Sequence, residues 1–134
     1  MKNALVSIAA VLALSSTAFA ADNYKLTVTP PATVLKGQQA VALVTVEGTN
    51  GFVMNLDYPV KLSITPPAGV TVVKATQTKP DAKKFAATGM AFEIRFTSAD
   101  VGTKAFNGKF TFAVSTAKDI APTTANISFS AVVK

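Results

Sequence analysis

The chain has 134 residues, with 13 Lys or Arg against 7 Asp or Glu and a formal net charge of +6. It contains no cysteine and no histidine. The lack of cysteine excludes thiol–disulfide chemistry and disulfide bonds, and the lack of histidine excludes serine–histidine–aspartate triads and imidazole metal sites. Because the basic residues are spread along the chain and aromatic residues do not interleave with them, the charge predicts a solvated surface and not a nucleic-acid interface.

The first twenty residues have the pattern of a bacterial secretory signal peptide. Lys2 precedes an apolar stretch from Ala4 to Leu14, and Ala18-Phe19-Ala20 matches the small-x-small pattern that signal peptidase cuts. The apolar stretch is much shorter than the roughly twenty residues needed to cross a bilayer. We therefore expect residues 1–20 to be removed after Ala20. Residues 21–134 are expected to form a single periplasmic or secreted domain that lacks a transmembrane segment.

Apolar and polar residues alternate with a period of two along most of the remaining chain, and convincing helical periodicity is absent. Such alternation is typical of strands with one buried face. The alternating runs are 25–29, 60–65, 92–97, 109–114 and 126–133, and the short run 70–73 is expected near a sheet edge. Residues 40–46 are apolar on both faces, which is typical of a central strand that is covered on both sides.

Turn signals separate these runs. Gly48-Thr49-Asn50-Gly51 contains an Asn-Gly pair, a strong hairpin signal because both turn positions need positive φ. Pro-Pro, Lys-Gly and Pro-Pro-Ala-Gly segments mark further turns. Counting the runs between breaks predicts about seven to nine strands at a spacing of about ten residues. The sequence therefore predicts an all-β fold, an immunoglobulin-like antiparallel β-sandwich.

The run GKFTFAVSTAKDIAP, from Gly108 to Pro122, resembles the redox-active segment of the N-terminal periplasmic domain of the DsbD thiol:disulfide interchange family. GFVMNLDYPVKLSITPPAGV, from Gly51 to Val70, and AFEIRFTSADVGTKAFNGKF extend the resemblance over most of the mature chain. In that family an aromatic-rich strand ends in Val-Cys-Thr, and Cys-x-Pro follows a short loop. The resemblance implies an immunoglobulin-like sandwich and places the two family cysteines at Ser115 and Ile120.

This sequence departs from the family pattern at both cysteine positions, and the departure excludes the family's thiol–disulfide exchange. Thiol–disulfide exchange needs a thiolate that attacks a disulfide sulfur, and neither Ser115 nor Ile120 supplies one. Ser115 is expected to point toward solvent or the loop, whereas Ile120 could fill the space that a disulfide would occupy. A second interpretation is that the vacated site binds a partner such as another envelope protein. The candidate binding loop consists of Thr116, Ala117, Lys118, Asp119, Ala121 and Pro122.

The sequence leaves three alternatives to a non-catalytic binding or structural module. A Ser115–Lys118 nucleophile rests only on a spacing of three residues across a loop. A copper or small-ligand carrier would use Met54, Met90 and carboxylates, although two methionines in apolar surroundings are typical of core packing. An envelope fibre subunit would use exposed strand edges. We expect no catalytic residues, no metal site and no cofactor.

Overall fold

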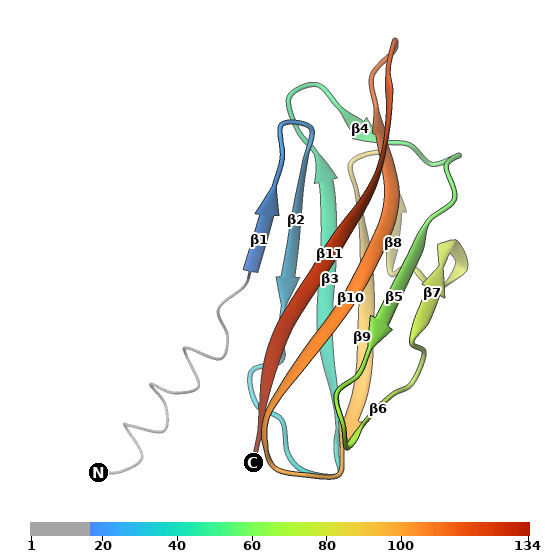
Figure 1. The fold of residues 1–134 in the computed structure, drawn as a ribbon. Coiled ribbons are helices and arrows are strands. Elements are labelled where there is room, and N and C mark those ends of the chain that lie inside the picture. The colour runs from blue at the N-terminus through green and yellow to red at the C-terminus, as the bar shows by residue number, and fades with distance from the viewer. Residues whose placement is uncertain (1–16) are drawn as a thin grey trace.

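The computed structural model describes residues 17–134, which form eleven strands and one short 3₁₀ turn (Figure 1). The strands are β1 (Thr17–Ala20), β2 (Tyr24–Thr29), β3 (Gln39–Gly48), β4 (Val53–Met54), β5 (Lys61–Thr65), β6 (Val70–Val72), β7 (Thr76–Thr78), β8 (Lys84–Ala86), β9 (Gly89–Ser98), β10 (Gly102–Ser115) and β11 (Ile120–Val133). The 3₁₀ turn η1 spans Lys79–Asp81. Within this described part of the chain, no helix has the length and apolar character needed to span a membrane.

The strands form two antiparallel sheets packed face to face (Figure 1). Sheet A has the order β1-β2-β3-β9-β6, with β8 also paired to β9. Sheet B has the order β11-β10-β5-β7, with β4 also paired to β10. The prediction of an all-β antiparallel sandwich is confirmed, and β6 lies at a sheet edge as expected for residues 70–73.

The core lies between the sheets and contains most of the aromatic side chains. Phe106 is 1% exposed, and its ring stacks on Phe129 at a centroid distance of 4.5 Å and contacts Phe96 at 4.7 Å. Phe92 of sheet A meets Phe110 of sheet B edge to face at 5.4 Å. Because these rings come from strands of both sheets, they hold the two layers together by apolar burial and ring contacts.

Strand β3 is central in sheet A, between β2 and β9. Its inward residues Ala40, Ala42, Val44 and Val46 are buried, whereas the outward residue Leu43 is only half-buried. The predicted central position is confirmed. Burial, however, is complete on the inner face alone, because the outward side chains of β3 are shielded only in part.

The Asn-Gly turn forms, but it does not make a hairpin. Asn50 and Gly51 have φ values of 55° and 86°, as the signal predicted, and the Phe52 N–H donates to the Thr49 carbonyl at 3.1 Å. However, β3 belongs to sheet A, whereas β4 pairs with β10 in sheet B. The expected hairpin is therefore wrong: the turn carries the chain from one sheet to the other.

The structure places β1 on the edge of sheet A, paired with β2 over four residues. These four residues lie inside the expected signal peptide. The remainder of that segment, residues 1–16, lies outside the described residues. The Ala21 N–H donates to the Tyr24 carbonyl at 3.0 Å, and the antiparallel alternation then directs the backbone groups of Leu26 and Val28 toward β1. Removal of residues 1–20 would leave these groups at an open edge.

We expect the amides of Leu26 and Val28 to lose their protection from hydrogen exchange when the chain begins at Ala21. The exchange rates of these two amides should rise toward those of fraying segments, because β1, their partner strand, has been removed. The amides of Lys25 and Thr27 serve as internal controls, since their backbone groups face β3 and keep their partners. Residue-resolved exchange of the full-length and shortened chains measures this. Equal protection of Leu26 in both chains would contradict it.

Candidate functional site

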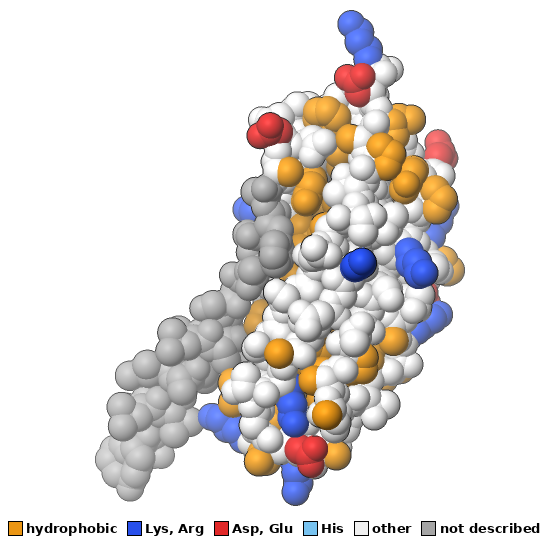
Figure 2. All heavy atoms as spheres, in the orientation of Figure 1, with side chains coloured by type: hydrophobic (Ala, Val, Ile, Leu, Met, Phe, Trp, Pro, Cys, Tyr) orange, Lys and Arg blue, Asp and Glu red, His pale blue; other side chains and the backbone are white. Residues whose placement is uncertain are grey.

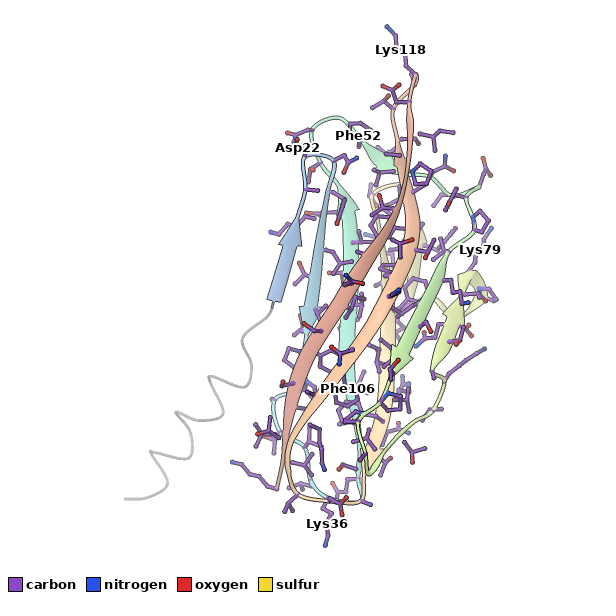
Figure 3. The ribbon with its side chains drawn as sticks, viewed as in Figure 1. Asp22, Lys36, Phe52, Lys79, Phe106 and Lys118 are labelled. Atoms are coloured by element: carbon purple, nitrogen blue, oxygen red, sulfur yellow. The ribbon has the colours of Figure 1, made fainter. Side chains whose placement is uncertain are left out.

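The β10–β11 hairpin carries Ser115 and Ile120, the two positions that match the family cysteines. The two strands pair without interruption over fourteen positions, from Gly102↔Val133 to Ser115↔Ile120. Four residues, 116–119, connect them. The Thr116 N–H donates to the Asp119 carbonyl at 2.9 Å, and the Thr116 hydroxyl accepts from the Asp119 N–H at 3.1 Å. These bonds hold the tip of the hairpin, with Lys118 at its end beyond the loops that carry Asp22 and Phe52 (Figure 3).

Ser115 and Ile120, the positions that match the family cysteines, lie directly opposite each other at the end of the ladder. Directly opposed residues in an antiparallel pair have their side chains on the same face, here the outer face of sheet B. Ser115 is half-buried, whereas Ile120 is 62% exposed. The expectation that Ile120 fills a hollow is therefore wrong. Ile120 lies in the end row of the β10–β11 ladder, and the hairpin that these strands form projects beyond the other strands (Figure 1).

A third strand extends this row. Val53 of β4 is opposite Ser115, so Val53, Ser115 and Ile120 lie side by side across β4, β10 and β11. Val53 is 47% exposed, and Leu56 in the segment after β4 is 36% exposed. We call Val53, Leu56 and Ile120 the hairpin-end patch. Figure 2 shows apolar side chains gathered around this end of the molecule, below the hairpin tip.

An Asn-centred turn fixes the segment that carries Leu56. The Asn55 N–H donates to the Ala113 carbonyl at 2.9 Å, which attaches the segment to β10. The Asn55 side-chain oxygen then accepts from the N–H groups of Asp57 at 2.9 Å and Tyr58 at 3.1 Å. This Asx-type turn reverses the chain directly after β4. Leu56 is therefore held beside β10 by defined hydrogen bonds.

The remaining residues of the candidate loop are solvent-accessible to different degrees. Ala117, Lys118 and Asp119 are exposed at the tip, while Thr116 is half-buried. Ala121 is half-buried and packs against the core, and Pro122 is exposed opposite the buried Ala113. The loop thus presents one cation and one anion above an apolar patch. This arrangement suits contact with another surface and contains no acid–base pair in a cleft.

The methionines proposed for a metal carrier are both core residues. Met54 is 2% exposed and pairs with Val114, and Met90 is 1% exposed and pairs with Val46. Their burial is the usual role of methionine as a filler of irregular core space. Within residues 17–134, no group of three or more Asp, Glu, His or Cys side chains is placed to hold a metal ion.

The basic segment around η1 is partly neutralised by its own neighbours. The Asp81 carboxylate accepts from the Lys74 ammonium at 2.7 Å and from the Thr78 N–H at 2.9 Å. The bond from Lys74, and then the one from Thr78, lowers the pKa of the Asp81 carboxyl. The Lys79 ammonium lies 5.1 Å from the centre of the Phe85 ring. These contacts stabilise the fold around η1, so the charged residues of this segment have structural roles.

No family model matches the chain, and a search of curated proteins finds no match. Among solved structures, the GAE domain of GGA2p from Saccharomyces cerevisiae aligns with a TM-score of 0.52 at 11% identity, over 86% of this chain and 97% of that one. A cohesin module from a Clostridium perfringens family 33 glycoside hydrolase aligns with a TM-score of 0.45 at 12% identity, over 85% and 98% of the two chains. The AggA fimbrial subunit from Escherichia coli aligns with a TM-score of 0.43 at 10% identity, over 90% and 96%.

At such low identity, the likeness to the GAE domain shows the fold alone. Together with the two packed antiparallel sheets, it identifies the chain as an immunoglobulin-like β-sandwich. The predicted fold class is thus confirmed.

Proposed function

We propose that this chain is an exported, non-catalytic immunoglobulin-like module that binds another envelope protein through the hairpin-end patch. In this proposal it is a relative of the DsbD N-terminal domain in which the redox hairpin has kept its shape and lost its sulfurs. The observation that carries the proposal is the exposure of Ile120 and Val53 in one row with Ser115. Exposed apolar side chains that gather at one place commonly mark an interaction site.

The scaffold supports a recognition role for this end. Rigid sheets that present short, well-held loops are the usual architecture of binding modules. Here the loop is fixed by Thr116 on one side and the neighbouring segment by Asn55 on the other. A partner would therefore meet a preformed surface, which limits the conformational entropy that binding costs.

Site-specific photo-crosslinking tests the proposal in the native envelope. A photoreactive residue at Ala117 should capture a defined partner, and Val53→Asp combined with Ile120→Asp should reduce that adduct about tenfold or more by placing charge in the contact. Val101→Asp is the matched control, because Val101 is 60% exposed in the β9–β10 turn, away from the patch. Equal loss of the adduct in both folded variants, or no change in the patch variant, would contradict the proposal.

A further inference from the structure

The outer edge of β2 is covered by residues that signal peptidase is expected to remove. Leu26 and Val28 direct their backbone groups at this edge, where Thr17–Ala20 of β1 pair with β2. Within residues 17–134, no strand other than β1 pairs with this side of β2. In a chain cut after Ala20, the N–H and carbonyl groups of Leu26 and Val28 are therefore at an open edge of sheet A. Such an edge is a template for an added strand.

The N-terminus of the cut chain cannot fold back to refill this edge. The Asp22 carbonyl accepts from the Thr49 hydroxyl at 3.3 Å and from the Asn50 side-chain amide. The Thr49 N–H donates to the Asn23 carbonyl at 3.1 Å. These bonds attach the start of the cut chain to the turn between β3 and β4, and Figure 3 shows Asp22 at that end of the sandwich. Only Ala21 precedes the attached segment, and one residue is too short to cover the edge.

The open edge is a short site with defined ends. At one end the Ala21 N–H donates to the Tyr24 carbonyl at 3.0 Å, so an added strand cannot pair there. At the other end Pro30 follows β2 and has no N–H to offer. Between these ends, residues 17–20 of the uncut chain lie antiparallel to residues 25–28. The structure therefore shows that the site has room for a strand of four residues.

The alternation of β2 determines which side chains an added strand should carry. Leu26 and Val28 are buried between the sheets, whereas Lys25 and Thr27 lie on the outer face of sheet A. Because directly opposed residues share a face, an added residue opposite Leu26 points its side chain toward the core. In the uncut chain the residue opposite Leu26 is Phe19, and alanines precede and follow it in the sequence. The site thus favours a large apolar residue between two small ones.

A second copy of the cut chain has no free segment with this pattern. Among residues 21–134, the phenylalanines with Ala, Ser or Thr on both sides are Phe112 and Phe129. Both side chains are buried, in the paired strands β10 and β11. Releasing either strand would remove aromatic rings from the core and break the longest ladder of sheet B. The added strand must therefore come from a different protein.

We propose that the open edge of β2 binds the C-terminal segment of another envelope protein as an added antiparallel strand. The carboxylate of that segment takes the place of the Ala20 carbonyl, next to the α-ammonium that cleavage creates at Ala21. These opposite charges form an ion pair at the point where Ala21 prevents further pairing. The inference rests on the exported form in the proposed function, because β2 is open only after cleavage, but it concerns a different surface from the hairpin-end patch.

Disulfide trapping of a peptide tests the site on a background that has no native cysteine. The protein is residues 21–134 with Thr27→Cys, which keeps every residue of the core cluster, and the peptide is SSTAFA, residues 15–20, with Ala18→Cys. In the register of β1 these two positions are directly opposed, about 4.5 Å apart between Cα atoms, which a disulfide can span. Thr45→Cys is the matched control, because Thr45 lies beside Thr27 on the same face but one strand further from the edge. Capture by Thr27→Cys should be about tenfold faster or more, because binding raises the effective thiol concentration.

Changes in the peptide test the two features of the proposed segment. Phe19→Ser in the peptide should slow capture about tenfold through lost apolar burial, and an amidated C-terminus should slow capture about two- to fivefold through loss of the ion pair. Equal capture of the acid and the amide would overturn the assignment to a C-terminus.

The uncut chain is the control for an occupied edge. With Thr27→Cys it should capture little of the peptide, because β1 already pairs with β2. Equal capture by the cut and uncut chains, or by Thr27→Cys and Thr45→Cys, would overturn the proposal. The protein is supplied already cut, so this result does not depend on export, which the N-terminal residue of the protein from the envelope tests separately. Val53→Asp with Ile120→Asp should leave capture unchanged, which separates this test from that of the hairpin-end patch.

Discussion

Replacing Phe106 by alanine is expected to lower the free energy of unfolding by about 3–5 kcal/mol. The Phe106 ring is 1% exposed and lies between Phe96 of sheet A and Phe129 of sheet B. Its removal leaves a cavity at the place where the two layers meet, and the stacked Phe129 ring loses its partner. Urea denaturation of residues 21–134, followed by circular dichroism, measures the change.

Phe106→Leu serves as the volume control for this prediction. Leucine keeps most of the buried apolar volume, so the loss should be clearly smaller than for alanine. If alanine and leucine cost the same, or if alanine costs less than about 1 kcal/mol, Phe106 would not act as the packing link between the sheets.

A Ser115→Cys and Ile120→Cys double variant is expected to form an intramolecular disulfide under mild oxidation. The two positions are directly opposed at the end of the β10–β11 ladder, which places their Cα atoms in the range that a disulfide requires. The bond closes a short loop, so we expect a stabilisation of about 2 kcal/mol. Thiol titration and denaturation with and without reductant measure both effects.

A mismatched pair controls for accidental oxidation. Ser115→Cys combined with Ala121→Cys should stay reduced, because Ala121 packs toward the core and Ser115 lies on the outer face. Free thiols in the folded Ser115/Ile120 variant would contradict the direct opposition of the two positions in the β10–β11 register. They would also weaken the proposed relationship to the DsbD family.

The longer strands could be predicted because apolar and polar residues alternate along them with a period of two. Phe92, Ile94 and Phe96 are all fully buried, and the polar residues between them face out, as the pattern indicates. β10 and β11 were predicted only over their apolar parts. The first half of β10 contains Lys104, Asn107 and Gly108, which weaken the alternation, yet the neighbouring strands keep this half in the sheet.

Three of the four shortest strands could not be predicted, and β6 is the exception. β4, β7 and β8 have only two or three residues each, too few for an alternation to be visible. They exist because longer strands offer them backbone partners. The Asn-Gly turn shows the same limit: its φ values follow from local chemistry, whereas the sheet that the next strand joins is decided by tertiary packing.

The candidate site was predicted in its position but not in its exposure. The resemblance placed Ser115 and Ile120 in one hairpin, and the register sets them opposite each other. Nothing in the sequence indicated that Ile120 would remain open, since that depends on which elements reach the end of the hairpin. Val53 was missed for a related reason, because its place in one row with Ser115 and Ile120 arises from the crossing of β4 into sheet B, and Leu56 follows β4 in the chain.

β10 comes after β4 and β5 in the chain, and this order has a consequence for when the sandwich can fold. The strands β4, β5 and β11 all pair with β10. Sheet B therefore cannot assemble until the chain has been synthesised as far as residue 115. A chain stopped before β10 could assemble strands of sheet A, but its inner side chains, such as Val44 and Phe92, would have no opposing layer. Incomplete molecules would thus expose an apolar surface to proteases. Molecules that include β10 and β11 would bury this surface and resist degradation.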